Sequence, residues 1–157
     1  MIGSFRINPL VTSNIIGPFN LAIDWLTDKI YLAQKSTSRI DAFTTDGLNR
    51  TNILASNLFA PTSVCVDVTQ SYLFVADAGN QMNVKMQPAK IERVNMDGTN
   101  RRVIVKDKLL EPTSLTLDTV KQRIYWVDKK YDHLETCDYF GRRRHIIASG
   151  LVLFSTQ

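Results

Sequence analysis

The sequence is poor in cysteine and histidine, and it has no long apolar run. Its two cysteines, Cys65 and Cys137, are too few for a disulfide scaffold and show no metal-ligand spacing, so we expect free, packed thiols. No apolar stretch is long enough to span a bilayer, and residues 1–10 lack the apolar segment of a signal peptide. If the protein is secretory, we therefore expect its natural N-terminus to lie elsewhere.

Motifs of catalysis are lacking as well. The sequence has no nucleophile elbow, no HExxH pair and no phosphate loop, and no window carries a helical apolar stripe. The net charge of +4 is mild, and no aromatic platform accompanies the basic residues, which argues against nucleic acid as a partner. We expect no enzyme, no cofactor and no bound metal. The 157 residues, 44% of them apolar, suffice for a packed globular domain.

What is present is a threefold repeat of three sequence pieces. The first piece starts with proline and ends with aspartate, the second contains an aromatic residue in every copy, and the third has a glycine turn followed by arginine. The copies are PFNLAID, PTSVCVD and PTSLTLD; IYLAQ, LFVAD and IYWVD; and RIDAFTTDGLNR, KIERVNMDGTNR and HLETCDYFGRRR. From proline to proline the period is 43 residues and then 51, because 8 extra residues lie between Asp77 and Ile91. A period near 43 residues points to propellers or helical arrays.

Each copy consists of four short β-rich runs separated by turn signals, which predicts strands. Asp-Gly pairs at Asp46 and Asp97 mark the hairpin between the third and fourth runs, and Gly141 keeps the glycine where Phe140 replaces the aspartate. Large apolar and small residues alternate in the first run, as in a strand flanked closely on both faces. The large residues are Leu21, Ile23, Val64, Val66, Leu115 and Leu117, and the small ones are Ala22, Cys65 and Thr116. We therefore predict an all-β fold of about three four-stranded antiparallel blades, part of a β-propeller.

These pieces resemble the class B (YWTD) repeats of the low-density-lipoprotein (LDL) receptor family, which read as proline, an LAxD strand, YWTD, and then IER…DG…R. The third copy, YWVD at residues 125–128, is the most similar, and the first copy loses the last aspartate at Gln34. The resemblance covers residues 18 to 150 and is strongest to the large LDL-receptor-related proteins. It implies a six-bladed propeller, of which this chain would supply a part.

On this basis we expect five segments. They are residues 1–17, the tail of a preceding blade; 18–60, blade 1; 61–111, blade 2 with a loop insertion; 112–150, blade 3; and 151–157, the truncated start of a next blade.

The resemblance also implies a function and a place in the cell. It implies an interaction module in the extracellular part of a single-pass endocytic receptor at the plasma membrane and in endosomes, attached to the membrane only through that parent receptor. Its partners would be protein ligands or neighbouring EGF-like and LDL-receptor class A modules, and it could assist acid-dependent ligand release. A Wnt co-receptor or a nidogen-like matrix propeller is the alternative within this class. A propeller hydrolase or lactonase is the alternative from another class.

The recurring aromatic residues and aspartates are interpreted as structural rather than as a ligand or metal site. The aromatics would fill the space between blades, and the carboxylates would accept backbone N–H groups at turns or in a neighbouring blade. These residues are Asp24, Tyr31, Asp67, Phe74, Asp77, Asp118, Tyr125, Trp126 and Asp128.

A candidate ligand face is predicted where the loops after the second strands and the segments before the first strands open on the same side. Loops on a rigid scaffold often carry recognition, and methionines with cationic neighbours suit an acidic protein partner. The candidate residues are Met82, Lys85, Met86, Lys129, Lys130, Tyr131 and His133. The alternative is an insertion without a role. His133 is a candidate pH switch, with an uncoupled exposed histidine as the alternative.

Two surface motifs complete the candidates. The basic cluster from Gly141 to His145 is interpreted as a solvated turn, with heparan sulfate or an acidic ligand as the alternative. Asn49 begins the NRT sequence at a predicted hairpin tip, and we expect a glycan there if the chain is extracellular.

Overall fold

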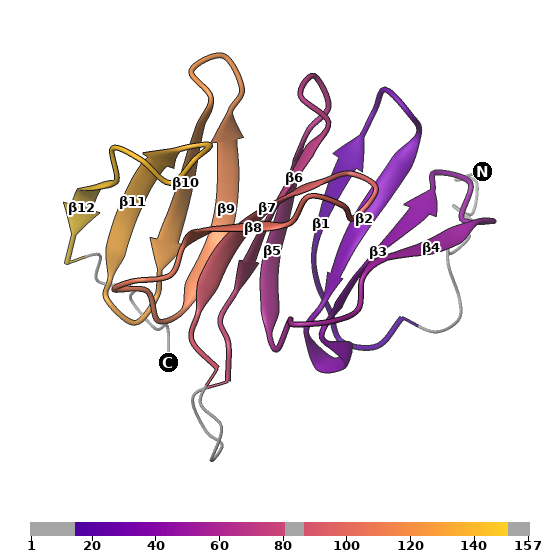
Figure 1. Ribbon diagram of the computed structural model, residues 1–157. Coiled ribbons are helices and arrows are strands. Elements are labelled where there is room, and N and C mark those ends of the chain that lie inside the picture. Colours follow the sequence, from indigo (N-terminus) through magenta and orange to yellow (C-terminus); the bar gives the residue numbers. More distant parts are fainter. Residues whose placement is uncertain (1–14, 81–86, 151–157) are drawn as a thin grey trace, which may run out of the picture.

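A computed structural model describes residues 15–80 and 87–150, which form three four-stranded antiparallel sheets in chain order (Figure 1). We call the sheets blades 1, 2 and 3. Blade 1 comprises β1 (Pro18–Asp24), β2 (Lys29–Gln34), β3 (Arg39–Thr44) and β4 (Arg50–Leu54). Blade 2 comprises β5 (Pro61–Asp67), β6 (Tyr72–Asp77), β7 (Lys90–Asn95) and β8 (Arg102–Val105). Blade 3 comprises β9 (Pro112–Asp118), β10 (Arg123–Asp128), β11 (His133–Asp138) and β12 (His145–Ser149).

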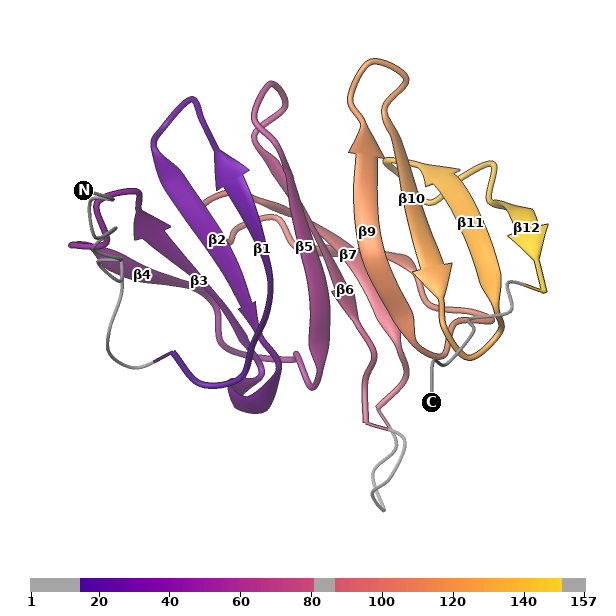
Figure 2. The same ribbon diagram turned by 180° about the vertical axis from the view of Figure 1, so that it is seen from behind.

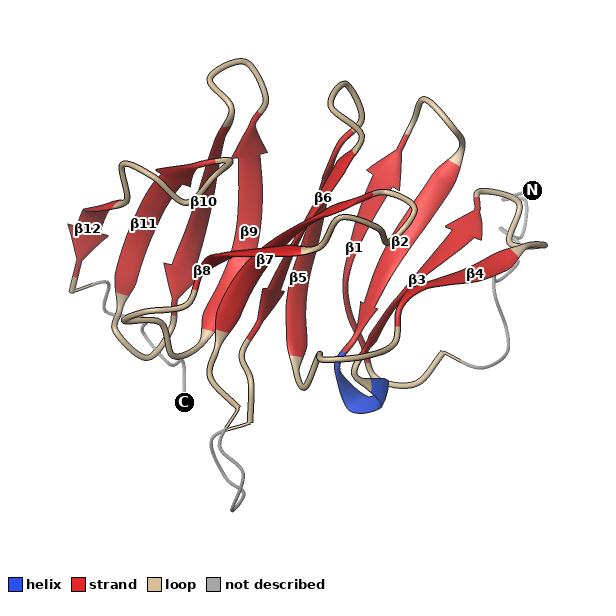
Figure 3. Ribbon diagram, viewed as in Figure 1, coloured by secondary structure: helices blue, strands red, loops and turns tan. Residues whose placement is uncertain are grey.

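The three blades stand side by side with their first strands together. The strands β1, β5 and β9 contact one another in series (Figures 1 and 2), while β4, β8 and β12 form the other edges of their sheets. Within the described ranges, the helical content is one short 3₁₀ turn, η1 (Lys35–Thr37; Figure 3). The prediction of consecutive blades over residues 20 to 148, with the LAID, VCVD and LTLD runs on the inner strands, is confirmed. The segments predicted as a tail at 1–17 and a next blade at 151–157 lie largely outside the described residues.

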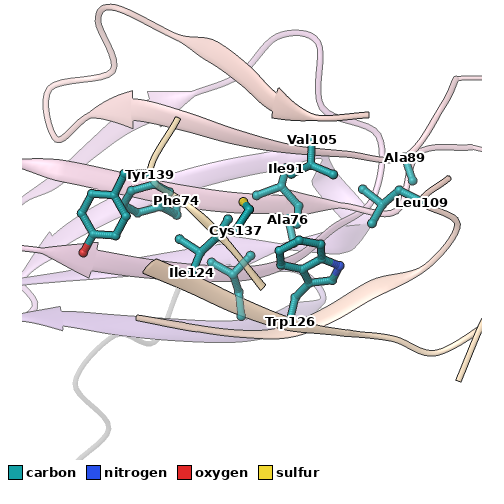
Figure 4. Packing of buried hydrophobic residues seen from close by; sticks show 11 residues of the cluster. Phe74, Ala76, Ala89, Ile91, Val105, Leu109, Ile124, Trp126, Cys137 and Tyr139 are labelled. Atoms are coloured by element: carbon teal, nitrogen blue, oxygen red, sulfur yellow. The ribbon is translucent and has the colours of Figure 1, made fainter. Parts of the chain in front are cut away.

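Two apolar cores fill the spaces between neighbouring blades. Tyr31 lies in the core between blades 1 and 2, and Phe74 and Trp126 lie in the core between blades 2 and 3. Figure 4 shows the second core, in which Cys137 and Ile91 also pack. The aromatic residues Tyr31, Phe74 and Trp126 therefore join neighbouring blades, because the pleat of each second strand sends alternate side chains to its two faces. Tyr125, at the position of Phe74 in blade 3, belongs to neither core and is half-buried.

The inner strands use both of their faces, as the alternating pattern predicted. On β5, Val64 and Val66 pack into the core shared with blade 1, while Cys65 packs against the core shared with blade 3. On β9, Leu115 and Leu117 face blade 2. A small residue on one face lets the next inner strand approach closely.

Polar side chains also join the inner strands of neighbouring blades, near the start of each strand. The side chain of Asn20 accepts the N–H of Val64 at 2.8 Å, and the hydroxyl of Ser63 accepts the N–H of Leu115 at 3.1 Å. Both acceptors stand two positions after the proline of their blade, and both donors three positions after the proline of the next. Buried donors are thereby satisfied at each junction between blades.

The glycine of the third-to-fourth-strand turn is required by the neighbouring blade. Gly98 and Gly141 have φ of +87° and +79°, and a Cβ at either position would overlap a backbone carbonyl oxygen of the preceding blade, at Ile53 or Ile104. This contact explains why Gly141 persists although Phe140 has replaced the aspartate of the turn.

The two cysteines are free and lie on the strands that the repeat predicted. Cys65 is on β5 and Cys137 on β11. Burial raises the pKa of both thiols, that of Cys137 to about 12, so both are protonated at neutral pH. The prediction of two packed thiols is confirmed.

Candidate interaction surface

The turns after the second strands and the segments before the first strands lie on one edge of the three blades, the lower edge in Figure 3. Backbone hydrogen bonds join each turn to its segment: Lys35 N to Gly17 O at 3.0 Å, Ala78 N to Ala60 O at 2.9 Å, and Lys129 N to Glu111 O at 3.0 Å. We call this the linker edge; it consists of residues 15–17, 35–38, 55–60, 78–80, 87–89, 106–111 and 129–132. The expectation that these loops open on the same side is confirmed.

The aspartate that ends the second strand holds the linker edge together. The carboxylate of Asp77 accepts the N–H groups of Phe59 at 3.0 Å and Ala60 at 2.8 Å. Asp128 accepts the two equivalent N–H groups ahead of β9, at 2.8 and 3.2 Å, and also two N–H groups of its own turn. These bonds match the structural role expected for the last residue of the motif.

Gln34, which replaces this aspartate in blade 1, keeps half of the arrangement. Its side-chain oxygen accepts the N–H of Ile16 at 3.1 Å. Ile16 holds the position that Phe59 has in blade 2. Its amide nitrogen donates to Asp41. A neutral amide thus serves where blades 2 and 3 use a carboxylate.

The aspartates that end the first strands fold the turns on the opposite edge. Asp24, Asp67 and Asp118 each accept N–H groups from the residues two or three positions ahead of them. Asp67 also accepts the hydroxyl of Tyr139 from blade 3 at 2.8 Å. Burial opposes ionisation of Asp67, but hydrogen bonds from Thr69, Tyr139 and the turn lower its pKa below the ordinary value.

An ion pair recurs at the outer strands of every blade. Arg101 pairs with Glu92 at 2.6 Å, and Arg144 pairs with Glu135 at 2.8 Å. In blade 1 the pair is Arg50 with Asp41, at 2.6 Å. The guanidinium groups of Arg101 and Arg144 also donate to two carbonyls of the segment that leads into their own blade.

This pair corrects part of the interpretation of the basic cluster. Arg142, Arg143 and His145 are exposed, as a solvated turn requires. Arg144 is instead engaged with Glu135 and with linker carbonyls, so its charge is already used within the fold.

A groove of about 550 Å³ opens beside the blade 3 ion pair. Its lining residues come from the linker, the β10–β11 turn, and β11 and β12. They are Lys108, Tyr131, His133, Glu135, Arg144, His145 and Ile146. The rings of Tyr131 and His133 are stacked, with their centroids 5.7 Å apart and an angle of 20° between their planes. The groove therefore combines aromatic faces with four basic side chains and one paired carboxylate.

Comparison with blade 2 indicates why space is available there. Lys90 holds the position of His133 in blade 2, and its ammonium group donates to the carbonyl of Asn57 at 2.5 Å and pairs with Glu92 at 3.2 Å. The imidazole of His133 is shorter and stacks on Tyr131. In blade 3 it thus leaves room that the longer lysine chain takes up in blade 2.

The structure places the predicted ligand residues as follows. Lys129, Lys130, Tyr131 and His133 lie together at the β10–β11 turn, and the ammonium of Lys130 is 3.9 Å from the carboxylate of Glu111. Met82, Lys85 and Met86 lie outside the described residues. Sequence reasoning missed the groove residues Lys108, Glu135, Arg144, His145 and Ile146 as a group. The recurrence of an acidic residue and arginine in all three copies was the signal for two of them.

Three other features bear on the surface. Asn49 is exposed at the β3–β4 hairpin, so a glycan is sterically possible there, and its presence stays a prediction. Over residues 15–80 and 87–150, no cluster of three or more potential metal ligands occurs. In the same ranges, no helix has the length and apolar character needed to cross a membrane.

The sequence motifs and the fold agree with comparisons to known proteins. Residues 71–119 match the family described as low-density lipoprotein receptor repeat class B, a span that runs from blade 2 into blade 3. The chain superposes on a protein chain in the crystal structure of a nidogen/laminin complex with a TM-score of 0.77 and 27% identity, over 87% of this chain and 50% of that one. The protein is thus a β-propeller chain built of LDL-receptor class B (YWTD) repeats.

The chain is also similar to three receptors. It is 33% identical over 143 residues to vitellogenin receptor Yl of Drosophila melanogaster and 30% identical to the vitellogenin receptor of Solenopsis invicta, in both cases over 91% of this chain. It is 29% identical to low-density lipoprotein receptor-related protein 5 of Mus musculus over 81% of this chain. The chain spans 7% to 8% of the length of these relatives.

Proposed function

We propose that this chain is a protein-interaction module of an endocytic receptor related to the LDL receptor, exposed on the outside of the cell. The observation that carries the proposal is the identity of 33% and 30% with two vitellogenin receptors across 91% of the chain. A yolk protein of the vitellogenin type is thus a first ligand to test. A receptor role also accounts for a surface without a catalytic motif.

We place the ligand surface on the linker edge and in the groove of blade 3. Lys129 and Lys130 are exposed beside the groove, and Lys108 and Tyr131 line it. A cationic rim around aromatic faces suits an acidic segment of a protein partner, because the charges steer the encounter and the rings bury apolar area. The insertion between Asp77 and Ile91 reaches the same edge through Asn80 and Gln87 and is proposed as part of this surface.

The groove favours an acidic partner over a basic one. Lys108, His133 and Arg144 line it together with a single carboxylate, that of Glu135. Release of the ligand would follow by competition, when an acidic module of the same receptor displaces it from this surface.

The test is binding of purified vitellogenin and of a tandem LDL-receptor class A module to the immobilised chain at low salt. Reversing both lysines (Lys129→Glu with Lys130→Glu) should weaken binding at least about fivefold through the loss of charge attraction. The matched control is Lys121→Glu, whose side chain is 73% exposed on the opposite edge, and its binding should not change. A variant lacking residues 79–87 tests the insertion. Equal binding by all variants would move the ligand surface away from the linker edge.

The same binding assay distinguishes the endocytic receptor from the two alternatives, a co-receptor and a matrix protein. Similarity to LDL-receptor-related protein 5 supports a co-receptor, and the nidogen structure supports a matrix protein. Failure of both probes, with retained binding to laminin, would favour the matrix alternative.

A further inference from the structure

Another pocket, of about 200 Å³, lies between the outer strands of blade 1 and the β7–β8 turn of blade 2. We call it the blade 1 pocket. Its lining residues are Lys29, Ala42, Phe43, Thr44, Asn49, Thr51, Ile53, Met96 and Asp97. Ala42, Ile53 and Met96 belong to the core between blades 1 and 2 or pack against it, so they give the pocket an apolar side.

In blade 2 an arginine fills the space that the blade 1 pocket leaves open. Arg93 holds the position of Ala42 and is 6% exposed. Its guanidinium lies 4.5 and 4.6 Å from the ring centroids of Tyr72 and Phe140, and it donates to the carbonyl of Tyr139 at 3.3 Å. At the other junction the positions of these three partners are held by Lys29, Asp97 and Met96, respectively. With alanine in place of arginine, the first junction has a pocket where the second has a stacked side chain.

The first junction does not need a buried cation at this place. The hydroxyl of Tyr31 donates to the carbonyl of Met96 at 3.4 Å, whereas Phe74 has no hydroxyl and Arg93 supplies the donor in blade 2. The two charged side chains that line the blade 1 pocket, Lys29 and Asp97, have opposite signs. A neutral occupant with an apolar face therefore suits this pocket.

Asn49 can supply such an occupant. It lines the pocket and begins the sequence Asn-Arg-Thr, the acceptor sequence for N-linked glycans, and both Asn49 and Thr51 are exposed. At the equivalent positions blade 2 has Asn-Arg-Arg (100–102) and blade 3 has Arg-Arg-His (143–145). The blade that lacks the arginine is thus the blade that has the glycan acceptor.

We propose that the blade 1 pocket holds the first N-acetylglucosamine of a glycan on Asn49, and that this sugar joins blades 1 and 2 as Arg93 joins blades 2 and 3. The side-chain Nδ2 of Asn49 forms a bond to C1 of the sugar. The C1–O bond to a lipid-linked pyrophosphate donor breaks, the pyrophosphate leaves with the bonding electrons, and the amide proton passes to a base of the transferase. This inference rests on the proposed function, because the chain must enter the secretory pathway to be glycosylated.

A small pocket suffices for a sugar that is attached at its wall. Pockets for free ligands usually have about 300–1,000 Å³, but tethering raises the effective concentration, so the seated group needs little affinity of its own. The sugar is neutral. Its acetyl methyl and the C–H face of its ring suit the apolar side at Ile53 and Met96, and its hydroxyls suit the exposed Lys29 and Asp97.

The first experiment is peptide mass spectrometry on the chain secreted from cultured human cells behind a signal peptide. Release of the glycan by peptide-N-glycosidase F in heavy-oxygen water should convert Asn49 to labelled aspartate, and Asn49→Gln should abolish the label. An unmodified Asn49 in the secreted chain would overturn the proposal. The vitellogenin assay is run separately on the chain with and without the glycan, so loss of ligand binding with an occupied Asn49 would refute the proposed function alone.

Seating of the sugar is measured after an endoglycosidase has trimmed the glycan to one N-acetylglucosamine. The reference is the same chain made in bacteria, which carries no glycan. The single sugar should raise Tm by about 2–4 °C, the shift expected for one favourable interaction in a domain of this size. Nuclear Overhauser contacts should join its acetyl methyl to the methyl group of Met96. Absence of these contacts would overturn the proposal, whatever the shift in Tm.

Two matched variants test the comparison between the blades. Ala42→Arg fills the blade 1 pocket and keeps the acceptor, so the chain should still be glycosylated but the sugar should no longer raise Tm. Arg102→Thr creates an acceptor at Asn100, beside the space that Arg93 fills, and a single sugar there should leave Tm within about 1 °C of the unglycosylated form. If Ala42→Arg does not fold, Arg102→Thr carries the same comparison. Equal gains in Tm from sugars on Asn49 and Asn100 would refute seating in the pocket.

Discussion

Blades 1 and 2 carry the same apolar pattern on their inner strands, yet the two patterns have different surroundings. Val64 on β5 is 2% exposed between two blades, whereas Leu21, its counterpart on β1, is 55% exposed. Fully burying such a side chain contributes about 1.5–3 kcal/mol relative to leaving it in water. Each repeat thus specifies an apolar face for the next blade, and this face stabilises the fold only where a neighbouring blade removes it from water.

The largest expected effect comes from placing a charge at these two counterparts. Val64→Asp puts an unpaired carboxylate between blades and should cost more than about 4 kcal/mol, enough to prevent folding. Leu21→Asp should change the free energy of unfolding by less than about 1 kcal/mol, because water reaches the new side chain. Urea unfolding of the two variants and of the original chain measures both losses. Similar losses for the two variants would contradict the comparison.

The basic turn of blade 3 offers the next contrast. Arg144→Gln removes the partner of the buried Glu135 and two bonds to linker carbonyls, so it should cost about 3 kcal/mol. Arg143→Gln, one residue earlier on the exposed side of the turn, should stay within about 0.5 kcal/mol of the original chain. Thermal and urea unfolding would show the difference. If the two variants are equally stable, the ion pair does not hold blade 3 to its linker.

Alanine substitutions at two glycines with positive φ distinguish the cost of backbone strain from the cost of a clash between blades. Gly150 has φ of +69° with nothing within 4 Å of an added Cβ, so Gly150→Ala should cost about 1 kcal/mol from strain alone. Gly141→Ala adds an overlap with the carbonyl of Ile104 and should cost about 2 kcal/mol more. Equal losses, measured by urea unfolding, would mean that β8 yields to the added methyl group.

A smaller effect is expected at the hydrogen bond between Tyr139 and Asp67. Tyr139→Phe removes a bond from blade 3 to blade 2 and should cost about 1 kcal/mol. The pKa of Asp67 is lowered in the folded chain, so its contribution is present above the ordinary value of about 3.9 and is lost as the pH falls through the lowered value. The difference between the variant and the original chain should therefore be largest near neutral pH and narrow in acid. A difference that does not change with pH would place the effect in packing alone.

Much of the fold could be predicted because the same pattern of strands and turns occurs three times in the sequence. Alternation with a period of two residues assigned Val64 and Cys65 to opposite faces, and the glycine turns placed the hairpins. The groove could not be predicted in the same way. It depends on the stacking of the His133 side chain on Tyr131, and on Lys108, which lies 25 residues before His133 in the chain.

The sequence by itself determined the number of blades, the order of their strands and the residues that each blade offers to its neighbours, because these follow from side-chain alternation and turn chemistry within about 43 residues. Tertiary structure alone decided which of these residues are buried. Leu21 and Leu115 hold the same place in the repeat, but β9 has β5 beside it and Leu115 is 7% exposed, whereas Leu21 is 55% exposed. Removal from water depends on every neighbour in space, and a pattern along the chain specifies only the face that a neighbour would cover.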